Sequence, residues 1–164
     1  MATIRLPHDF KEFLKLLEEN EVEYLLIGGY AVGFHGYPRA TVDMDIWVAT
    51  TPDNAPRVVT VLKEFGFDVP ELSPELFLTE GQVIRMGVPP VRLEILTSIS
   101  GVTFVECYAA RVIAELDGVR TSLINLSSEL EGGRRFLLVQ WHVSNPKPTG
   151  NVPHESIEPV RRCR

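Results

Sequence analysis

Residues 28–48 read GGYAVGFHGYPRATVDMDIWV, and this stretch decides the fold. An apolar run at residues 24–27 leads into the two glycines, and thirteen residues separate the second glycine from an Asp-Met-Asp triplet. A second apolar run, IWV, follows the triplet. We therefore expect a strand, a glycine turn, a short helix and then a second strand that carries two carboxylates.

Asp43 and Asp45 are two positions apart, so alternation along a strand places both on one face and Met44 on the other. Two carboxylates that share a face repel each other. They are stable together when a cation lies between them or when one of them stays protonated. This pair is therefore the first candidate for a functional site.

The size and composition are those of an ordinary globular domain. The chain has 164 residues, of which 45% are hydrophobic and 23% are charged. No apolar stretch reaches the ~18–20 residues of a membrane span, and the N-terminus lacks the apolar core of a signal peptide. Cys107 and Cys163 form neither a disulfide framework nor a metal-ligand spacing. We expect a cytoplasmic protein with no membrane partner.

The net charge of −6 is unevenly distributed along the chain. Residues 134–164 carry six Lys/Arg and two Asp/Glu, a net charge of +4, so the other 133 residues carry −10. An acidic body argues against tight, non-specific binding of nucleic acid, which depends on neutralising phosphates. It leaves open a nucleotide that is bound through metal ions.

Hydrophobic periodicity and turn residues predict an α/β (α+β) domain with a mixed β-sheet flanked by helices. The predicted strands are residues 22–27, 42–48, 83–86 and 91–96, and a β-hairpin is predicted near residues 111–124, around Asp117 and Gly118. The predicted helices are residues 8–20 with Asp9 as N-cap, 30–34, 51–65 with Thr51 as N-cap and 103–110, with a shorter helical turn from residue 73.

The composition changes toward the C-terminus. Residues 144–164 read SNPKPTGNVPHESIEPVRRCR, with four prolines and hardly any apolar residues. We expect residues 1–133 to form the domain and residues 134–164 to be a divergent, Pro-rich and partly disordered segment. Within that segment, residues 136–141 are apolar enough for a strand but have no clear partner.

A third carboxylate, Glu94, interrupts the apolar strand at residues 91–96. A bare charge in such a strand is costly, so Asp43, Asp45 and Glu94 all call for compensation. If the two strands are neighbours, the three side chains can converge. Oxygen ligands of this kind suit Mg²⁺, and two such ions stabilise an in-line displacement at phosphorus. Gly28 and Gly29 either form only a tight turn or let backbone N–H groups approach a phosphate.

The combination of an apolar strand, Gly-Gly, Asp-x-Asp and a later carboxylate resembles the nucleotidyltransferase superfamily of the DNA polymerase β type. More narrowly, residues 28–48 resemble small prokaryotic nucleotidyltransferase-like proteins related to the AbiEii abortive-infection toxins. Residues 91–112, VRLEILTSISGVTFVECYAARV, are similar to the same group, which usually has Asp in place of Glu94. The resemblance covers about residues 8–130.

The resemblance implies a site and a reaction. Asp43, Asp45 and Glu94 match the catalytic, metal-binding carboxylates, of which the third also helps to deprotonate the attacking hydroxyl. Gly28 and Gly29 match the phosphate-facing turn, and Arg39 and Thr41 match an R-x-T that precedes the aspartates. The implied enzyme uses Mg²⁺ (or Mn²⁺) to move an NMP from an NTP to a hydroxyl acceptor, which is a nucleic-acid end, a protein or a small molecule. The toxin relationship raises tRNA or protein as acceptor and implies an antitoxin partner.

Two departures from the pattern keep alternatives open. Tyr30 stands where the superfamily often has Ser, and the Gly-Arg-x-Lys-Asp stretch of related proteins is absent after residue 130. We expect either a change of reading frame near residue 130 or a degenerate terminus. The alternatives are a catalytically inactive nucleotide-binding or protein-interaction member of the fold, and a metal-dependent phosphohydrolase. Arg39 either binds phosphate or neutralises the aspartates, and Arg92 is expected to be a solvated strand charge.

Overall fold

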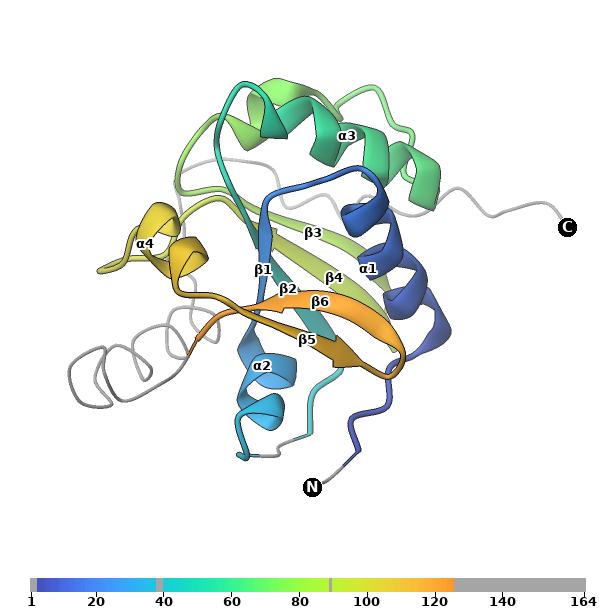
Figure 1. Ribbon diagram of the computed structural model, residues 1–164. Coiled ribbons are helices and arrows are strands. Elements are labelled where there is room, and N and C mark those ends of the chain that lie inside the picture. The colour runs from blue at the N-terminus through green and yellow to red at the C-terminus, as the bar shows by residue number, and fades with distance from the viewer. Residues whose placement is uncertain (1–2, 38–39, 89, 126–164) are drawn as a thin grey trace, which may run out of the picture.

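The computed structural model describes residues 3–37, 40–88 and 90–125, which form a six-stranded mixed sheet flanked by helices (Figure 1). This architecture confirms the predicted α/β class and the hairpin near residues 111–124. The helices are α1 (His8–Glu19), α2 (Gly28–Phe34), α3 (Asn54–Phe65) and α4 (Phe104–Ala109), with a 3-10 helix at Pro74–Phe77. The strands are β1 (Tyr24–Ile27), β2 (Asp43–Val48), β3 (Val83–Val88), β4 (Val91–Leu96), β5 (Val112–Leu116) and β6 (Val119–Leu123).

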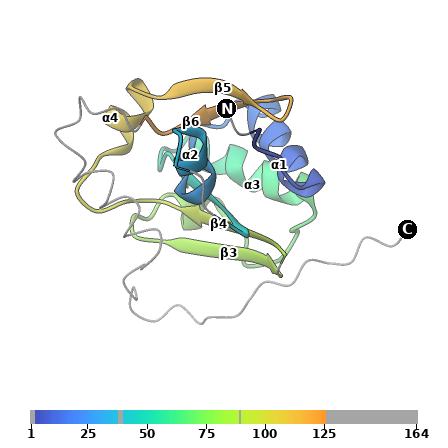
Figure 2. The ribbon, with the colours of Figure 1, turned by 90° about the horizontal axis from the view of Figure 1, so that it is seen from below.

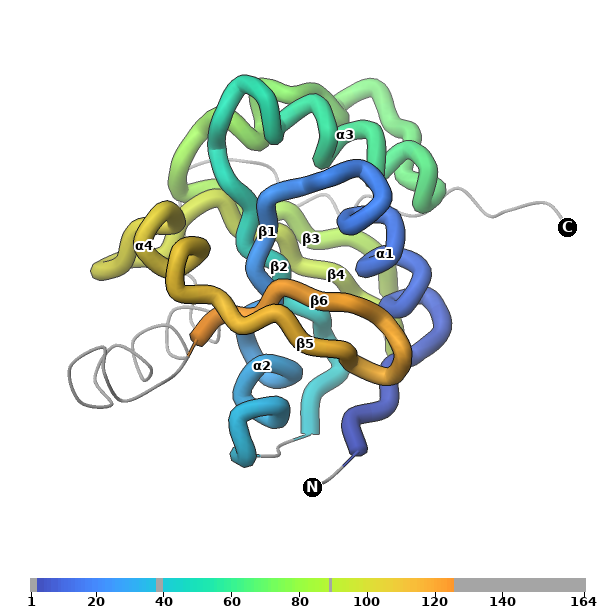
Figure 3. Tube along the Cα trace, in the orientation of Figure 1, coloured from blue at the N-terminus to red at the C-terminus, as the bar shows by residue number. Residues whose placement is uncertain are grey.

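The two strands of residues 24–48 lie at the centre of the sheet, whose order is β3-β4-β2-β1-β6-β5. Strand β2 runs antiparallel to β1 and parallel to β4, and β1 runs parallel to β6 (Figure 3). The outer strands β3 and β5 form antiparallel hairpins with β4 and β6. Every residue of β1 is buried, as its continuous apolar sequence predicts.

Helix α1 shows which face of the sheet each side chain takes. The hydroxyl of Tyr24 on β1 donates a hydrogen bond to Glu18 Oε1 of α1 at 2.9 Å, so Tyr24 lies on the face that α1 covers. Tyr24 pairs with Val48, and alternation along β2 then places Met44 on the same face. Asp43 and Asp45 therefore lie on the opposite face, as the sequence predicts.

Helices α1 and α3 pack together on one side of the sheet (Figure 2). Phe13 of α1 meets Phe65 of α3 edge-on, with 5.2 Å between ring centroids. Helix α4 packs on the other face, where the ring of Phe104 lies edge-on to Trp47 of β2 at 5.2 Å. Trp47 shares its face with Asp45, so α4 packs on the same face of the sheet that carries the carboxylates.

The predicted starts of α1, α2 and α3 are wrong in detail. Helix α2 begins at Gly28 rather than at residue 30, so the two glycines lie in its first turn instead of forming a separate turn before it. Asp9 is not the N-cap of α1, because the helix begins at His8 after Pro7 and has no side-chain cap. Asp9 lies in the first turn instead, where its charge still opposes the positive end of the helix dipole. Helix α3 begins at Asn54 rather than at residue 51, although Thr51 Oγ1 still accepts a hydrogen bond from the backbone N–H of Asn54 at 3.2 Å. It ends at Gly66, with φ +119°, as predicted.

Within the described residues, no helix has the length and apolar character that crossing a membrane requires. The expected C-terminal segment at residues 134–164, including the apolar run at residues 136–141, lies outside the described residues.

One buried polar side chain, which the sequence pattern does not reveal, ties the central strands to α3. Asn54 is 2% exposed and accepts a hydrogen bond at Oδ1 from the backbone N–H of Glu23 at 2.8 Å. Its amide donates to the backbone carbonyls of Glu23 and Ala49, both at 3.0 Å. Asn54 therefore joins the start of β1, the end of β2 and the start of α3.

Replacing Asn54 with Ala should destabilise the protein by about 2–4 kcal/mol, because three backbone groups lose a buried partner. Urea unfolding followed by circular dichroism measures the change. Thr60→Ala on the exposed side of α3 is the control, since Thr60 Oγ1 makes only an exposed hydrogen bond to Pro56. Equal midpoints for the two variants would contradict the role assigned to Asn54.

Candidate functional site

The centre of the candidate site is a pair of buried carboxylates on adjacent strands. Asp45 of β2 lies directly opposite Glu94 of β4 in the parallel register, so both side chains are on the same face. Each residue is only 6% exposed. The structure thus brings together two of the predicted acids, from positions almost fifty residues apart in the sequence.

The third predicted acid, Asp43, is held by an arginine. Arg92 is its register partner on β4, and its Nε and Nη2 donate to the two carboxylate oxygens of Asp43 at 3.0 and 2.6 Å. The hydrogen bonding to Asp43 is the main reason why the pKa of Arg92 is raised above its ordinary value. The charges of Glu94 and Asp45 act in the same direction, so all three acids lie in the field of one guanidinium.

A second arginine holds Glu94. Arg85 on β3 is the antiparallel register partner of Glu94, and its Nε donates to Glu94 Oε1 at 2.8 Å. The side chain of Glu94 is 8% exposed and that of Arg85 is 41% exposed. Among the described residues, β2, β4 and β3 therefore contribute to this face three carboxylates (Asp43, Asp45 and Glu94) and the guanidiniums of Arg92 and Arg85.

Gly28 and Gly29, the first two residues of α2, pack directly against Asp45 and Thr41. Gly28 has φ +69°, and a Cβ placed on it would lie 2.1 Å from Asp45 Oδ2. A Cβ on Gly29 would lie 2.6 Å from the Cβ of Thr41. Both positions thus require glycine, the first for its backbone conformation as well as for space. Because these residues have no side chain, the backbone at the start of α2 can lie beside the Asp45 carboxylate.

The remaining predicted residues differ in how the structure places them. Thr41 is half-buried, and its hydroxyl donates to the backbone carbonyl of Asp43 at 3.1 Å, so it supports the start of β2. Arg39 lies outside the described residues. Tyr30 packs edge-on against Phe10 at 5.8 Å between ring centroids. Burial raises the pKa of Tyr30, and the charge of Asp43 raises it further, so its ring is close enough to the site to sense that carboxylate.

The expectation that Arg92 is a solvated strand charge is wrong, because Arg92 neutralises Asp43. The alternation of side chains along a strand could have revealed this pairing. Arg92 is two residues before Glu94 and so shares its face, just as Asp43 shares the face of Asp45. Arg85 could not be assigned in this way, because its pairing depends on the register of the hairpin formed by β3 and β4.

The three acids suit a hard divalent cation, because all of their donor atoms are carboxylate oxygens and they outnumber the guanidiniums that the described residues bring to them. The carboxylate oxygens of Asp43, Asp45 and Glu94 do not form a group that lies within 4.8 Å of one another. Within the part of the chain that the structure describes, the group of three such residues whose ligand atoms lie within 4.8 Å of one another is His8, Asp9 and Glu12. The arginine pairs hold Asp43 and Glu94 in their present positions.

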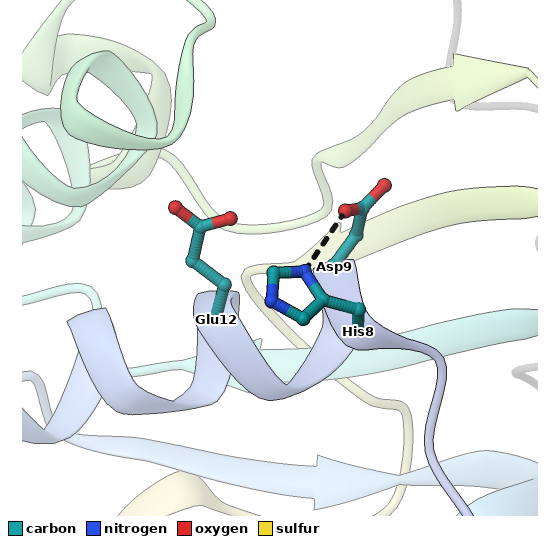
Figure 4. A group of neighbouring side chains, drawn as sticks. All are labelled: His8, Asp9 and Glu12. Atoms are coloured by element: carbon teal, nitrogen blue, oxygen red, sulfur yellow. Dashed lines mark ion pairs between the residues drawn. The ribbon is translucent and has the colours of Figure 1, made fainter.

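The group of His8, Asp9 and Glu12 lies at the start of α1 (Figure 4). His8 and Asp9 are exposed, and the 3.7 Å contact between them joins two solvated side chains. Because α1 covers the opposite face of the sheet from Asp45, this group does not belong to the candidate site. Exposed acids in the first turn of a helix also have an ordinary role, which is to oppose the helix dipole.

Gly28→Ala should destabilise the protein by about 2 kcal/mol more than Gly36→Ala, because the new methyl group overlaps Asp45. Gly36 is a matched control: it also has a positive φ, +96°, but nothing lies within 4 Å of the position that its new methyl group would take. The difference in unfolding free energy, measured in urea, therefore isolates the overlap from the backbone strain. The difference should shrink in an Asp45→Ala background, and a difference that stays the same would contradict the contact.

No protein-family model and no curated protein matches the chain. The fold is similar to the crystal structure of a Thermotoga maritima protein provisionally described as a nucleotidyltransferase. The two chains are 15% identical, and the match covers 74% of this chain and 78% of that chain with a TM-score of 0.51. At this level of identity the likeness shows the fold. The chain thus has a nucleotidyltransferase-like fold, with a mixed sheet flanked by helices.

Proposed function

We propose that the protein is a divalent-metal-dependent nucleotidyltransferase that moves an NMP from an NTP to a hydroxyl acceptor. The observation that carries the proposal is the burial of Asp45 directly opposite Glu94, with Asp43 two residues away on the same face. Adjacent buried carboxylates are costly unless a cation compensates them. The similarity of fold to a protein described as a nucleotidyltransferase supports the same reaction class.

Asp43, Asp45 and Glu94 are the residues that would hold Mg²⁺ or Mn²⁺. The ion, when bound, neutralises charge on the phosphates and favours ionisation of the acceptor hydroxyl. The hydroxyl oxygen forms a bond to the α-phosphorus of the NTP, the bond to the bridging oxygen breaks, and pyrophosphate leaves. In this proposal Glu94 acts as the general base that assists the removal of the hydroxyl proton.

The start of α2 at Gly28 and Gly29 has a place in the same proposal. Because neither residue has a side chain, the backbone comes close to Asp45 and Thr41, and its N–H groups are proposed to bind a phosphate that the metal ion brings to this face. Thr41 fixes the chain that leads into Asp43, and Arg39 is proposed to contact the nucleotide as well. The resemblance to AbiEii-related proteins adds two points to the proposal. The leading candidates for the acceptor are tRNA and protein, and an antitoxin is the proposed partner.

One observation favours a second candidate, a non-catalytic nucleotide-binding or protein-interaction member of the fold. Arg92 and Arg85 already neutralise Asp43 and Glu94, so the acids are compensated in part without a metal ion. A protein that has lost catalysis could keep its fold in this way. The two candidates differ in turnover, because only the first releases pyrophosphate and labels an acceptor.

The test is transfer of label from an α-labelled NTP in the presence of Mg²⁺, with tRNA, protein and small hydroxyl compounds offered as acceptors. The wild type should label an acceptor, and Asp45→Asn should lower the rate by at least about 100-fold, because an essential ligand is lost without a change of shape. Asp68→Asn is the matched control, since the Asp68 side chain is 75% exposed and lies outside the site.

Retained transfer by Asp45→Asn would contradict the site, and excess EDTA should abolish transfer by the wild type. Release of phosphate or pyrophosphate without a labelled acceptor would favour the metal-dependent phosphohydrolase. Binding of the NTP with no turnover at all would favour the non-catalytic candidate.

A further inference from the structure

Two ion pairs bracket the buried pair formed by Asp45 and Glu94. Arg92 holds Asp43 through a two-pronged interaction at 3.0 and 2.6 Å, and Arg85 holds Glu94 at 2.8 Å. The pairs follow from the register, because Arg92 is opposite Asp43 and Arg85 is opposite Glu94. Asp43 and Glu94, which are proposed metal ligands, are therefore each bound to a guanidinium of the protein itself.

The arginines differ from the acids in how firmly the fold holds them. The side chains of Arg92 and Arg85 are 36% and 41% exposed, whereas those of Asp43 and Glu94 are 23% and 8% exposed. An arginine has a long, flexible stem, so its guanidinium can leave a carboxylate and enter solvent while its backbone stays in the strand. The carboxylates cannot move in the same way, because β2 and β4 fix them in the centre of the sheet.

A divalent ion competes with the guanidiniums for the same oxygens. Arg92 binds both oxygens of Asp43, so an ion that takes this carboxylate must displace at least one of the two hydrogen bonds. A displaced guanidinium stays on the same face of the sheet as the acids. Guanidinium groups bind phosphate oxygens with the same two-pronged geometry that they use for carboxylates.

We propose that Arg85 and Arg92 form an arginine latch that exchanges partners: they hold Glu94 and Asp43 in the metal-free protein and pass to the phosphates of the nucleotide when the metal ion takes the carboxylates. The exchange rests on the proposed function, which brings a metal ion and an NTP to this face. The exchange assigns phosphate binding to Arg85 in β3 and Arg92 in β4, in addition to the start of α2 at Gly28.

The exchange predicts opposite effects on two affinities. Arg92→Met and Arg85→Met should each bind Mn²⁺ alone roughly fivefold more tightly, because the ion no longer competes with a guanidinium. The same variants should bind the complex of Mn²⁺ with a non-hydrolysable ATP analogue roughly fivefold more weakly than the wild type, because a phosphate partner is lost. Electron paramagnetic resonance measures free Mn²⁺, and calorimetry measures the analogue.

Two further variants separate the exchange from simpler effects. Arg120→Met removes an equal charge from an exposed ion pair with Glu18, outside the candidate site, and should change neither affinity. Arg92→Lys keeps the charge but loses the two-pronged geometry. It should still bind Mn²⁺ more tightly than the wild type, whereas long-range repulsion alone would leave the affinity unchanged.

Circular dichroism first establishes that each variant folds. If Arg92→Met does not fold, the test uses Arg92→Lys and Arg85→Met instead. Unchanged or weaker Mn²⁺ binding in the variants, with Mn²⁺ bound by the wild type, would overturn the latch and leave the proposed function standing. Unchanged affinity for the analogue would overturn the exchange to phosphate. Absence of Mn²⁺ binding in the wild type and in all variants would overturn the proposed function and the latch together.

Discussion

The parallel pairing of β2 with β4 is the constraint on which the candidate site depends. It places Asp45 opposite Glu94, both almost completely buried, in the middle of a six-stranded sheet. Two carboxylates in this position lose hydration and repel each other, and positive charge in their surroundings offsets this cost. The ion pairs of Arg92 with Asp43 and of Arg85 with Glu94 supply part of it, and the proposed ion would supply the rest.

Much of this arrangement could be predicted from residues 24–48. Alternation alone put Asp43 and Asp45 on one face, and the continuous apolar run of β1 indicated a strand that is buried on both faces. The sequence does not show which strand lies beside β2, however. It predicted that Glu94 converges with the two aspartates only if β2 and β4 are neighbours. The structure satisfies that condition and identifies the partner of each residue through the register.

The features that the sequence did not predict are those that depend on long-range registers or on buried polar groups. Arg85 reaches Glu94 only because the hairpin of β3 and β4 has one particular register. Asn54 binds Glu23 only because α3 returns to the start of β1. The two glycines were predicted as a turn, but they are the first residues of α2, and their contacts with Asp45 and Thr41 explain why neither can carry a side chain. Local patterns identify elements, whereas such contacts require the assembled sheet.

The most direct measurement of the central claim is the anomalous diffraction signal of Mn²⁺ in crystals that also contain a non-hydrolysable NTP. We predict a peak within about 2.2 Å of carboxylate oxygens of Asp43 and Asp45, with Glu94 at the same ion or beside it. Arg92 should then have left Asp43 for a phosphate. A peak only at the exposed group of His8, Asp9 and Glu12, or no peak on the face that carries Asp45, would contradict the claim.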